Sequence, residues 1–97
     1  SLSAVEALAS EIWPSAPLVV VSVPDARKGE RLVLLTSDTK IARDAFIRHV
    51  REKGVSELNI PADIMLVDKI PLLGSGKADF VTATKLAKDQ MAAKTAA

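Results

Sequence analysis

Residues 71–80, with the sequence PLLGSGKADF, place a single lysine in a loop that holds two of the chain's four glycines. Glycine opens backbone conformations that other residues avoid, and it leaves the peptide groups accessible. Lys77 adds a compact cation with three hydrogen-bond donors. The candidate site is therefore Gly74, Ser75, Gly76 and Lys77. It has three interpretations: a surface turn, a phosphate cradle, or a catalytic arm that acts on a ligand held outside this chain.

Two phosphate-binding motifs can be compared directly with this loop. The P-loop pattern requires a glycine six positions before the lysine and a serine or threonine directly after it. Those two positions hold Pro71 and Ala78, so the pattern fails at both. The dinucleotide fingerprint requires a further glycine three residues after Gly76, where Asp79 stands. A self-contained phosphate cradle is therefore not expected.

The composition excludes several other kinds of site. The chain has no cysteine, which excludes disulfides, thiolate metal sites and cysteine nucleophiles. Its single histidine, His49, is too little for a histidine metal site or a serine–histidine–aspartate triad, so no metal site is expected; the residue lies beside Phe46 and is expected to be packed or half-exposed. Thirteen basic residues against twelve acidic ones, with no tyrosine, argue against a nucleic-acid partner.

The length and hydropathy indicate one soluble globular domain over residues 1–97. Hydrophobic residues make up 48% of the chain and charged residues 26%, which is typical of a folded protein with a core. No apolar run reaches the roughly 18 residues that a membrane-spanning helix needs. The chain starts without methionine or a signal peptide pattern, and we expect it to be a piece of a longer protein.

The first half of the sequence predicts a helix followed by a β-hairpin. Ser3 is a candidate N-cap with Glu6 as its capping-box partner, and a proline at position 14 stops the helical pattern. Residues 18–23 form a β-branched run with the length of a buried strand. Residues 24–30 have turn composition, and residues 31–36 form a second strand that is expected to pair with the first.

The second half predicts two helices and a third strand. A helix is expected over residues 41–53, with its N-cap in the SDTK segment at residues 37–40 and Gly54 as its C-cap. A strand is expected over residues 63–68.

The last helix is expected to begin at about Phe80 with Asp79 as its cap, and residues 90–97 are expected to fray. The resulting order is α-β-β-α-β-α, an α+β fold with a small three-stranded sheet and flanking helices.

A pattern that extends well beyond the loop comes from three segments: SLSAVE at residues 1–6, VPDARKGERLVLLT at residues 23–36, and IPADIMLVDKIPLLGSGKADF at residues 60–80. In order and spacing they resemble the C-terminal subdomain of the adenylate-forming superfamily, which includes acyl-CoA synthetases, luciferases and peptide-synthetase adenylation domains. The opening segment is similar to the one that follows the family's interdomain hinge. The resemblance covers the chain from residue 1 to about residue 88.

Two positions differ from the commonest form of the family. Leu73 stands where threonine is frequent, and Phe80 stands where arginine is frequent. This variant is most similar to bacterial bifunctional enzymes that ligate fatty acid to acyl carrier protein and re-acylate 2-acylglycerophosphoethanolamine. The likeness implies a parent protein at the bacterial inner membrane, or otherwise in the cytoplasm, with fatty acid and lysophospholipid among its substrates.

The resemblance also implies a role for the loop. Lys77 would enter the active site of a large N-terminal domain, where an acid and ATP form an acyl-adenylate, and the subdomain would then rotate so that a thiol can displace AMP. Gly74, Ser75 and Gly76 would form a substrate and nucleotide loop that fits both poses. ATP with Mg²⁺ would be bound mainly by the N-terminal domain, so the isolated chain would hold no cofactor and would be inactive.

Three alternatives remain open at this point. Coenzyme A can replace acyl carrier protein as the thiol. Arg43, Arg48 and Arg51 crowd one helix, which is either a docking surface for an acidic carrier protein or a solvated helix face. If docking is the only role, the domain is a non-catalytic interaction module. Glu30 is expected to pair with nearby basic groups, or else to belong to the rotating face.

Overall fold

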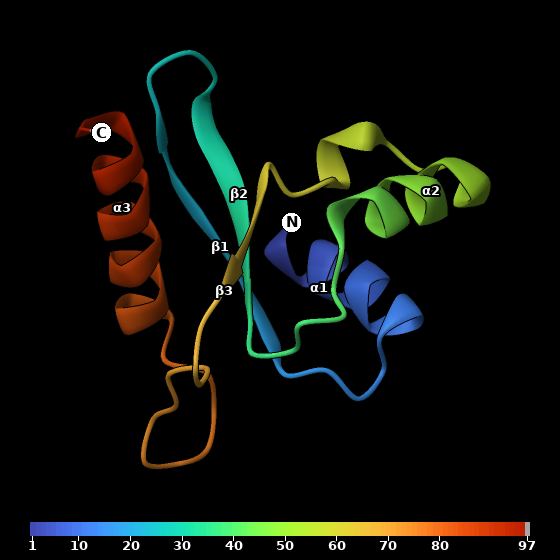
Figure 1. Ribbon diagram of the computed structural model, residues 1–97. Coiled ribbons are helices and arrows are strands. Elements are labelled where there is room, and N and C mark those ends of the chain that lie inside the picture. The colour runs from blue at the N-terminus through green and yellow to red at the C-terminus, as the bar shows by residue number, and fades with distance from the viewer. Residues whose placement is uncertain (97) are drawn as a thin grey trace.

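The computed structural model describes residues 1–96, which form an α+β domain with helices on both faces of one sheet (Figure 1). Within this described part the elements are α1 (Leu2–Ile12), β1 (Leu18–Asp25), β2 (Gly29–Thr36), α2 (Arg43–Lys53), the 3-10 helix η1 (Glu57–Asn59), β3 (Asp63–Leu66) and α3 (Phe80–Ala96). The predicted order and the three-stranded sheet are confirmed. The sequence pattern does not predict η1.

The sheet has the strand order β1-β2-β3. β1 and β2 form the predicted antiparallel hairpin, in register from Leu18 opposite Thr36 to Asp25 opposite Gly29. This ladder is longer than expected, so only residues 26–28 remain as the turn. β3 pairs in parallel with the other edge of β2. Parallel neighbours need a crossover connection, which places α2 over one face of the sheet.

Alternation along the strands separates the core into two layers. Val19, Val21 and Val23 of β1 point to the face covered by α3, whereas Val20 points to the face covered by α1 and α2 (Figure 1). All four valines are buried. The period of two residues that defines a strand therefore gives both faces of β1 an apolar partner.

The predicted cap of α1 is wrong by two residues. Ser1, not Ser3, is the N-cap, and its hydroxyl accepts the N–H of Ala4 at 3.3 Å. Glu6 instead accepts the N–H of Val20 at 3.0 Å. β1 is an edge strand, so its N–H groups that face away from β2 need another acceptor, and the Glu6 carboxylate supplies one.

The predicted N-cap of α2 is also wrong. The helix begins at Arg43 behind Ala42, without a side-chain cap bond. The Asp38 carboxylate instead accepts the N–H of Lys40 at 2.8 Å. Because this bond closes a local turn, the carboxylate is not available to cap the helix. The C-terminal prediction is confirmed, since Gly54 ends α2 in the left-handed conformation with φ of 73°.

Helix α3 begins at Phe80 as predicted and packs through two small residues. Ala83 and Ala87 are fully buried against the valines of β1. Small side chains let the helix axis approach the sheet closely, so the start of α3 is held firmly in place.

The end of α3 extends further than the sequence pattern indicates. Residues 90–97, where fraying is expected, are helical through Ala96, and residue 97 lies outside the described residues. Met91 packs against the same core layer, and the Lys94 ammonium lies 3.8 Å from the Asp63 carboxylate at the start of β3. These contacts tie the last turns of the helix to the sheet.

Candidate functional site

The glycine loop between β3 and α3 is a closed hairpin (Figure 1, orange). The N–H of Leu73 donates to the carbonyl of Lys77 at 2.8 Å, and the N–H of Gly76 donates to the carbonyl of Leu73 at 2.9 Å. Leu72 and Ala78 form an antiparallel bridge one step further in. This pattern is that of a three-residue hairpin loop whose third residue is left-handed. The loop is therefore a small shaped element rather than an open chain.

The two glycines of this hairpin have different roles. Gly76 has φ of 88°, in the left-handed region that strains other residues, and the hairpin requires it there. Gly74 does not have a positive φ, and an added Cβ would meet no atom within 4 Å. Only Gly76 is needed for the conformation that the structure shows, whereas the sequence analysis treats both glycines alike.

Lys77 is exposed at the end of this hairpin. Its backbone N–H donates to the Ser75 hydroxyl at 3.4 Å, a long bond, while its ammonium has no hydrogen-bond or ion-pair partner within residues 1–96. The site residues Gly74, Ser75, Gly76 and Lys77 are thus brought together. The arrangement presents one uncompensated cation, which can bind a carboxylate or phosphate oxygen supplied from outside.

Four large apolar side chains within five residues of Lys77 in the sequence are exposed. Leu72 is 60% exposed, Leu73 49%, Phe80 47% and Val81 83%. Large apolar side chains clustered at an exposed point mark a surface that contacts another surface. The cation is therefore presented in a setting that would lose water on contact, which strengthens its attraction for an anion.

Asp79 joins this hairpin to α3. Its N–H donates to the carbonyl of Pro71 at 2.9 Å, closing the base of the hairpin. Its carboxylate accepts the N–H of Thr82 at 3.1 Å and the Thr82 hydroxyl at 2.7 Å, which confirms the predicted cap. The hydrogen bonds from Thr82 lower the pKa of Asp79 below its usual value. The carboxylate therefore remains charged at neutral pH.

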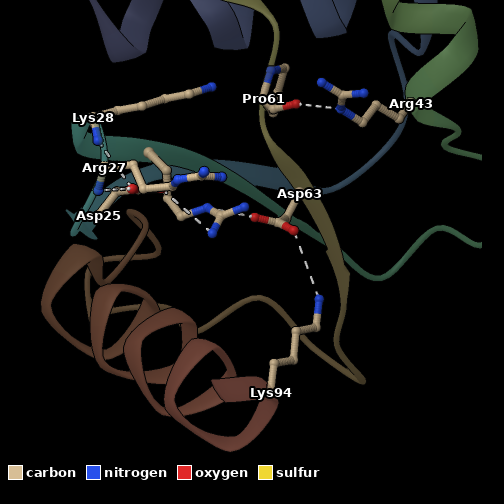
Figure 2. Close-up of polar contacts among 8 residues, drawn as sticks. Asp25, Arg27, Lys28, Arg43, Pro61, Asp63 and Lys94 are labelled. Atoms are coloured by element: carbon tan, nitrogen blue, oxygen red, sulfur yellow. Dashed lines mark hydrogen bonds and ion pairs between the residues drawn. The ribbon is translucent and has the colours of Figure 1, made fainter.

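A second polar cluster lies between β2, β3 and α3, near the turn of the first hairpin (Figure 2). One carboxylate oxygen of Asp63 lies 3.8 Å from the ammonium of Lys94 on α3, and the other lies 3.0 Å from Nε of Arg31. Arg31 also reaches Asp25 at 3.6 Å. The contact between Arg31 and Asp63 is at hydrogen-bond distance without hydrogen-bond alignment, so we regard it as an ion pair. The sequence pattern does not reveal this network, because its members come from four separate elements, β1, β2, β3 and α3.

The turn of the first hairpin is fixed by Asp25. Its carboxylate accepts the N–H groups of Arg27 at 2.8 Å and Lys28 at 3.2 Å, and these bonds, together with the charge of Arg31, lower the pKa of Asp25. Glu30 is exposed and makes no ion pair within residues 1–96. The expected structural pairing of Glu30 is therefore wrong, because Asp25 and Asp63 already satisfy the nearby arginine.

The three arginines of α2 do not form one patch. Nε of Arg43 donates to the carbonyl of Pro61 at 2.8 Å, which ties α2 to the segment before β3 (Figure 2). Arg51 pairs with Glu57 of η1 at 3.3 Å. Only Arg48 has no partner in the part of the chain that the structure describes. Two of the three predicted docking cations are thus engaged within the domain.

His49 joins α2 to α1. Its Nε2 lies 2.7 Å from the Glu11 carboxylate, which also accepts from the ammonium of Lys53 at 2.6 Å. Bonds from Lys53 and then His49 lower the pKa of Glu11. The imidazole is half-exposed, as expected, and its contacts indicate a structural role.

Two kinds of feature are absent from residues 1–96. No group of three histidine, cysteine, aspartate or glutamate side chains is placed to hold a metal ion in this range. Across the same range, no helix has the length and hydropathy needed to span a bilayer.

The fold matches solved structures of much larger proteins. The amide bond synthetase McbA from Marinactinospora thermotolerans superposes with a TM-score of 0.71 at 25% identity, over 88% of this chain and 18% of its own. The acyl-CoA synthetase of Brucella canis gives 0.72 at 22% identity, over 93% and 18%. The fatty acyl CoA synthetase of Mycobacterium tuberculosis gives 0.70 at 15% identity, over 84% and 16%. The sequence matches no protein-family model.

These matching proteins are adenylate-forming enzymes, and the order of helices and strands agrees with their small C-terminal part. This chain has the fold of an adenylate-forming C-terminal subdomain. It spans less than a fifth of the length of each of these three proteins. In the described residues the Lys77 hairpin projects from the base of the sheet, and no side chain pairs with its ammonium (Figure 1).

Proposed function

We propose that this chain is the mobile C-terminal subdomain of an ATP-dependent ligase, and that Lys77 supplies the cation for its adenylation step. The observation that supports this best is the unpaired ammonium of Lys77 on a closed, projecting hairpin. Arg31, beside the turn of the other hairpin, is ion-paired within the domain, and so are Arg51 and Lys53 of α2. The Lys77 ammonium has no such partner in residues 1–96.

The chemistry of adenylation gives such a cation a specific task. A carboxylate oxygen of the acid attacks the α-phosphorus of ATP, the bond to the bridging oxygen breaks, and pyrophosphate leaves while AMP stays joined to the acid. Two anions must approach each other in this step, so a positioned ammonium lowers the barrier. Loss of one such donor typically slows a reaction about 10²–10³-fold. ATP with Mg²⁺ would be held mainly by the larger domain, and Lys77 would contribute charge and hydrogen bonds.

For the acid and the thiol, we propose a fatty acid and acyl carrier protein. The parent protein would also re-acylate 2-acylglycerophosphoethanolamine at the bacterial inner membrane. The support is the loop variant, with Leu73 and Phe80 at the two positions that differ from the common family form. Coenzyme A is the alternative thiol. A full-length parent that transfers the acyl group to coenzyme A in preference to carrier protein would overturn the carrier assignment.

A docking module without catalysis is the weaker proposal. It needs a basic surface on α2, where Arg43 and Arg51 already bind Pro61 and Glu57. Charge reversal at Arg48 should therefore reduce binding of an acidic carrier protein only slightly. A strong loss of binding, with adenylation unchanged, would revive the docking role.

The test of the main proposal is fatty-acid-dependent exchange of pyrophosphate into ATP by the full-length parent. Lys77→Ala is expected to reduce exchange about 10²–10³-fold. Thiolation from pre-made acyl-adenylate should survive, because Lys77 is withdrawn in that pose. Lys88→Ala is the matched control, since Lys88 is an exposed lysine on α3 without a partner in residues 1–96. If Lys77→Ala and Lys88→Ala both retain exchange, Lys77 is a surface lysine.

A further inference from the structure

Asp79 makes more contacts across the joint between hairpin and helix than a simple cap requires. Its backbone N–H closes the base of the hairpin on Pro71, and its carbonyl accepts the N–H of Ala83 at 3.0 Å in the first turn of α3. Its carboxylate accepts both donors of Thr82. A single residue thus joins the hairpin that carries Lys77 to the helix that packs against the sheet.

The two sides of this joint are fixed to very different degrees. Helix α3 is anchored by Ala83 and Ala87, both fully buried against the sheet. The hairpin has no such anchor, because Leu72 and Leu73 are exposed and a Cβ added at Gly74 would meet no atom within 4 Å. The direction in which the hairpin projects is therefore set at its base.

Lys77 lies only two residues from this joint, on the second arm of the hairpin. A change in the angle between hairpin and helix moves the lysine directly, with no intervening packed element to absorb it. Reactions that depend on positioning are sensitive to this, since a misplacement of about 1 Å can cost about 10²-fold in rate.

We propose that Asp79 is a positioning residue for Lys77, which sets the direction of the hairpin by capping α3 through Thr82. This inference rests on the proposed adenylation role of Lys77. Asp79 itself contacts neither acid nor nucleotide in this account. Its effect passes through the geometry of the loop.

The variants that test this separate positioning from folding. Asp79→Ala removes both carboxylate bonds, whereas Thr82→Val removes only the 2.7 Å bond from the hydroxyl and keeps the bond from the N–H. Asp79→Asn retains an oxygen that can accept the Thr82 N–H, so it should rescue most of the function. Ser1→Ala is the matched control, because it removes the N-cap of α1, which lies on the opposite face of the sheet from α3 (Figure 1).

The readout is adenylation and thiolation by the full-length parent, with kcat and KM for ATP measured separately. Asp79→Ala is expected to lower adenylation kcat by at least about tenfold with KM for ATP little changed. Thr82→Val should give a smaller loss of the same kind, and thiolation from pre-made acyl-adenylate should persist. Ser1→Ala should leave both half-reactions intact.

Each outcome has a distinct meaning. If Asp79→Ala lowers both half-reactions equally, or if it matches Ser1→Ala, the residue is only a helix cap and the inference is wrong. If Asp79→Ala fails to fold, Thr82→Val decides, and full adenylation by that variant would overturn the inference. Lys77→Ala is assayed alongside: normal adenylation by Lys77→Ala refutes the proposed function, whereas loss in Lys77→Ala with none in Thr82→Val refutes only the role of Asp79.

Discussion

The domain has two hairpins with a left-handed glycine, and they lie at opposite ends of the sheet (Figure 1). The hairpin of β1 and β2 has an eight-residue ladder and a tip fixed by Asp25. The hairpin around Lys77 has one bridge and a few backbone bonds. Gly29 and Gly76 have φ of 80° and 88°, so the turn chemistry is similar while the supporting structure differs.

The two hairpins differ more clearly in the pairing of their basic side chains than in their length. Arg31, beside the first turn, is shared between Asp25 and Asp63, so its charge is neutralised within the domain. Lys77 makes no ion pair in residues 1–96. Arg31 thus contributes its charge to the fold, and we propose that Lys77 leaves its charge free for a ligand.

The largest expected effect on stability comes from the first hairpin. Arg31→Ala leaves two half-buried carboxylates with less compensating charge, since Asp63 keeps only Lys94 at 3.8 Å. Losing a partner costs several kcal/mol in a buried pair and under 1 kcal/mol in an exposed one, so we expect about 1–2 kcal/mol here. Urea unfolding of the 97-residue chain measures this. Lys77→Ala in the same assay should change stability by less than about 0.5 kcal/mol.

Similar losses in both variants would remove the contrast between structural and free cations. A stability loss for Lys77→Ala as large as that for Arg31→Ala would show that Lys77 has a partner in the folded domain.

The next effect concerns the two left-handed glycines. Alanine at either Gly29 or Gly76 costs about 1–2 kcal/mol of backbone strain. In the first hairpin the ladder belongs to the core, so Gly29→Ala should lower the free energy of global unfolding. In the second hairpin the loop can open alone, so Gly76→Ala should mainly speed amide exchange at Leu73, whose N–H closes the loop.

Gly74→Ala is the matched control for this pair, because Gly74 has no positive φ and has room for a Cβ. If amide exchange at Leu73 is no faster in Gly76→Ala than in Gly74→Ala, the loop does not depend on a left-handed residue at position 76.

The smallest effect is a dependence of stability on acid. The pKa values of Asp25 and Asp79 are both lowered by the hydrogen bonds they accept. A carboxyl whose pKa is lower in the folded state stabilises the fold above its unfolded pKa of about 3.9, and this contribution is lost as pH falls through the folded value. Thermal unfolding should therefore show a Tm that declines below about pH 4.

The decline should be shallower for Asp25→Asn and for Asp79→Asn than for the native chain, because each substitution removes one titrating group. An unchanged decline in both variants would assign the acid sensitivity to other carboxylates, of which Glu11, with its own lowered pKa, is the first candidate.

The sequence predicts the local features of this fold well. The strands at residues 18–23 and 31–36, the C-cap at Gly54 and the cap at Asp79 are each set by residues close together in the chain, and all are confirmed. The identity of the site loop is visible for the same reason. Structural features that depend on residues close together in the chain can be predicted from the sequence.

Features that depend on distant contacts are the ones that sequence reasoning misses. Glu6 is a good capping-box residue in isolation, yet the N–H of Val20, fourteen positions away, takes its carboxylate. Arg43 and Arg51 look like a free basic patch until Pro61 and Glu57 are brought beside them. The closed form of the Lys77 hairpin is not visible in the sequence either, because two glycines suggest an open loop although only Gly76 is required by the turn.

We propose that Lys77 is a free cation for adenylation, whereas Arg31 of the other hairpin is paired within the fold and the exposed Lys28 beside it has no part in the reaction. The most direct test is pyrophosphate exchange by the full-length parent carrying Lys77→Ala or Lys28→Ala, because each variant removes one exposed lysine from a hairpin tip. We expect exchange to fall about 10²–10³-fold in Lys77→Ala and to stay near native in Lys28→Ala. Equal exchange in the two variants, whether both retain it or both lose it, would contradict the account.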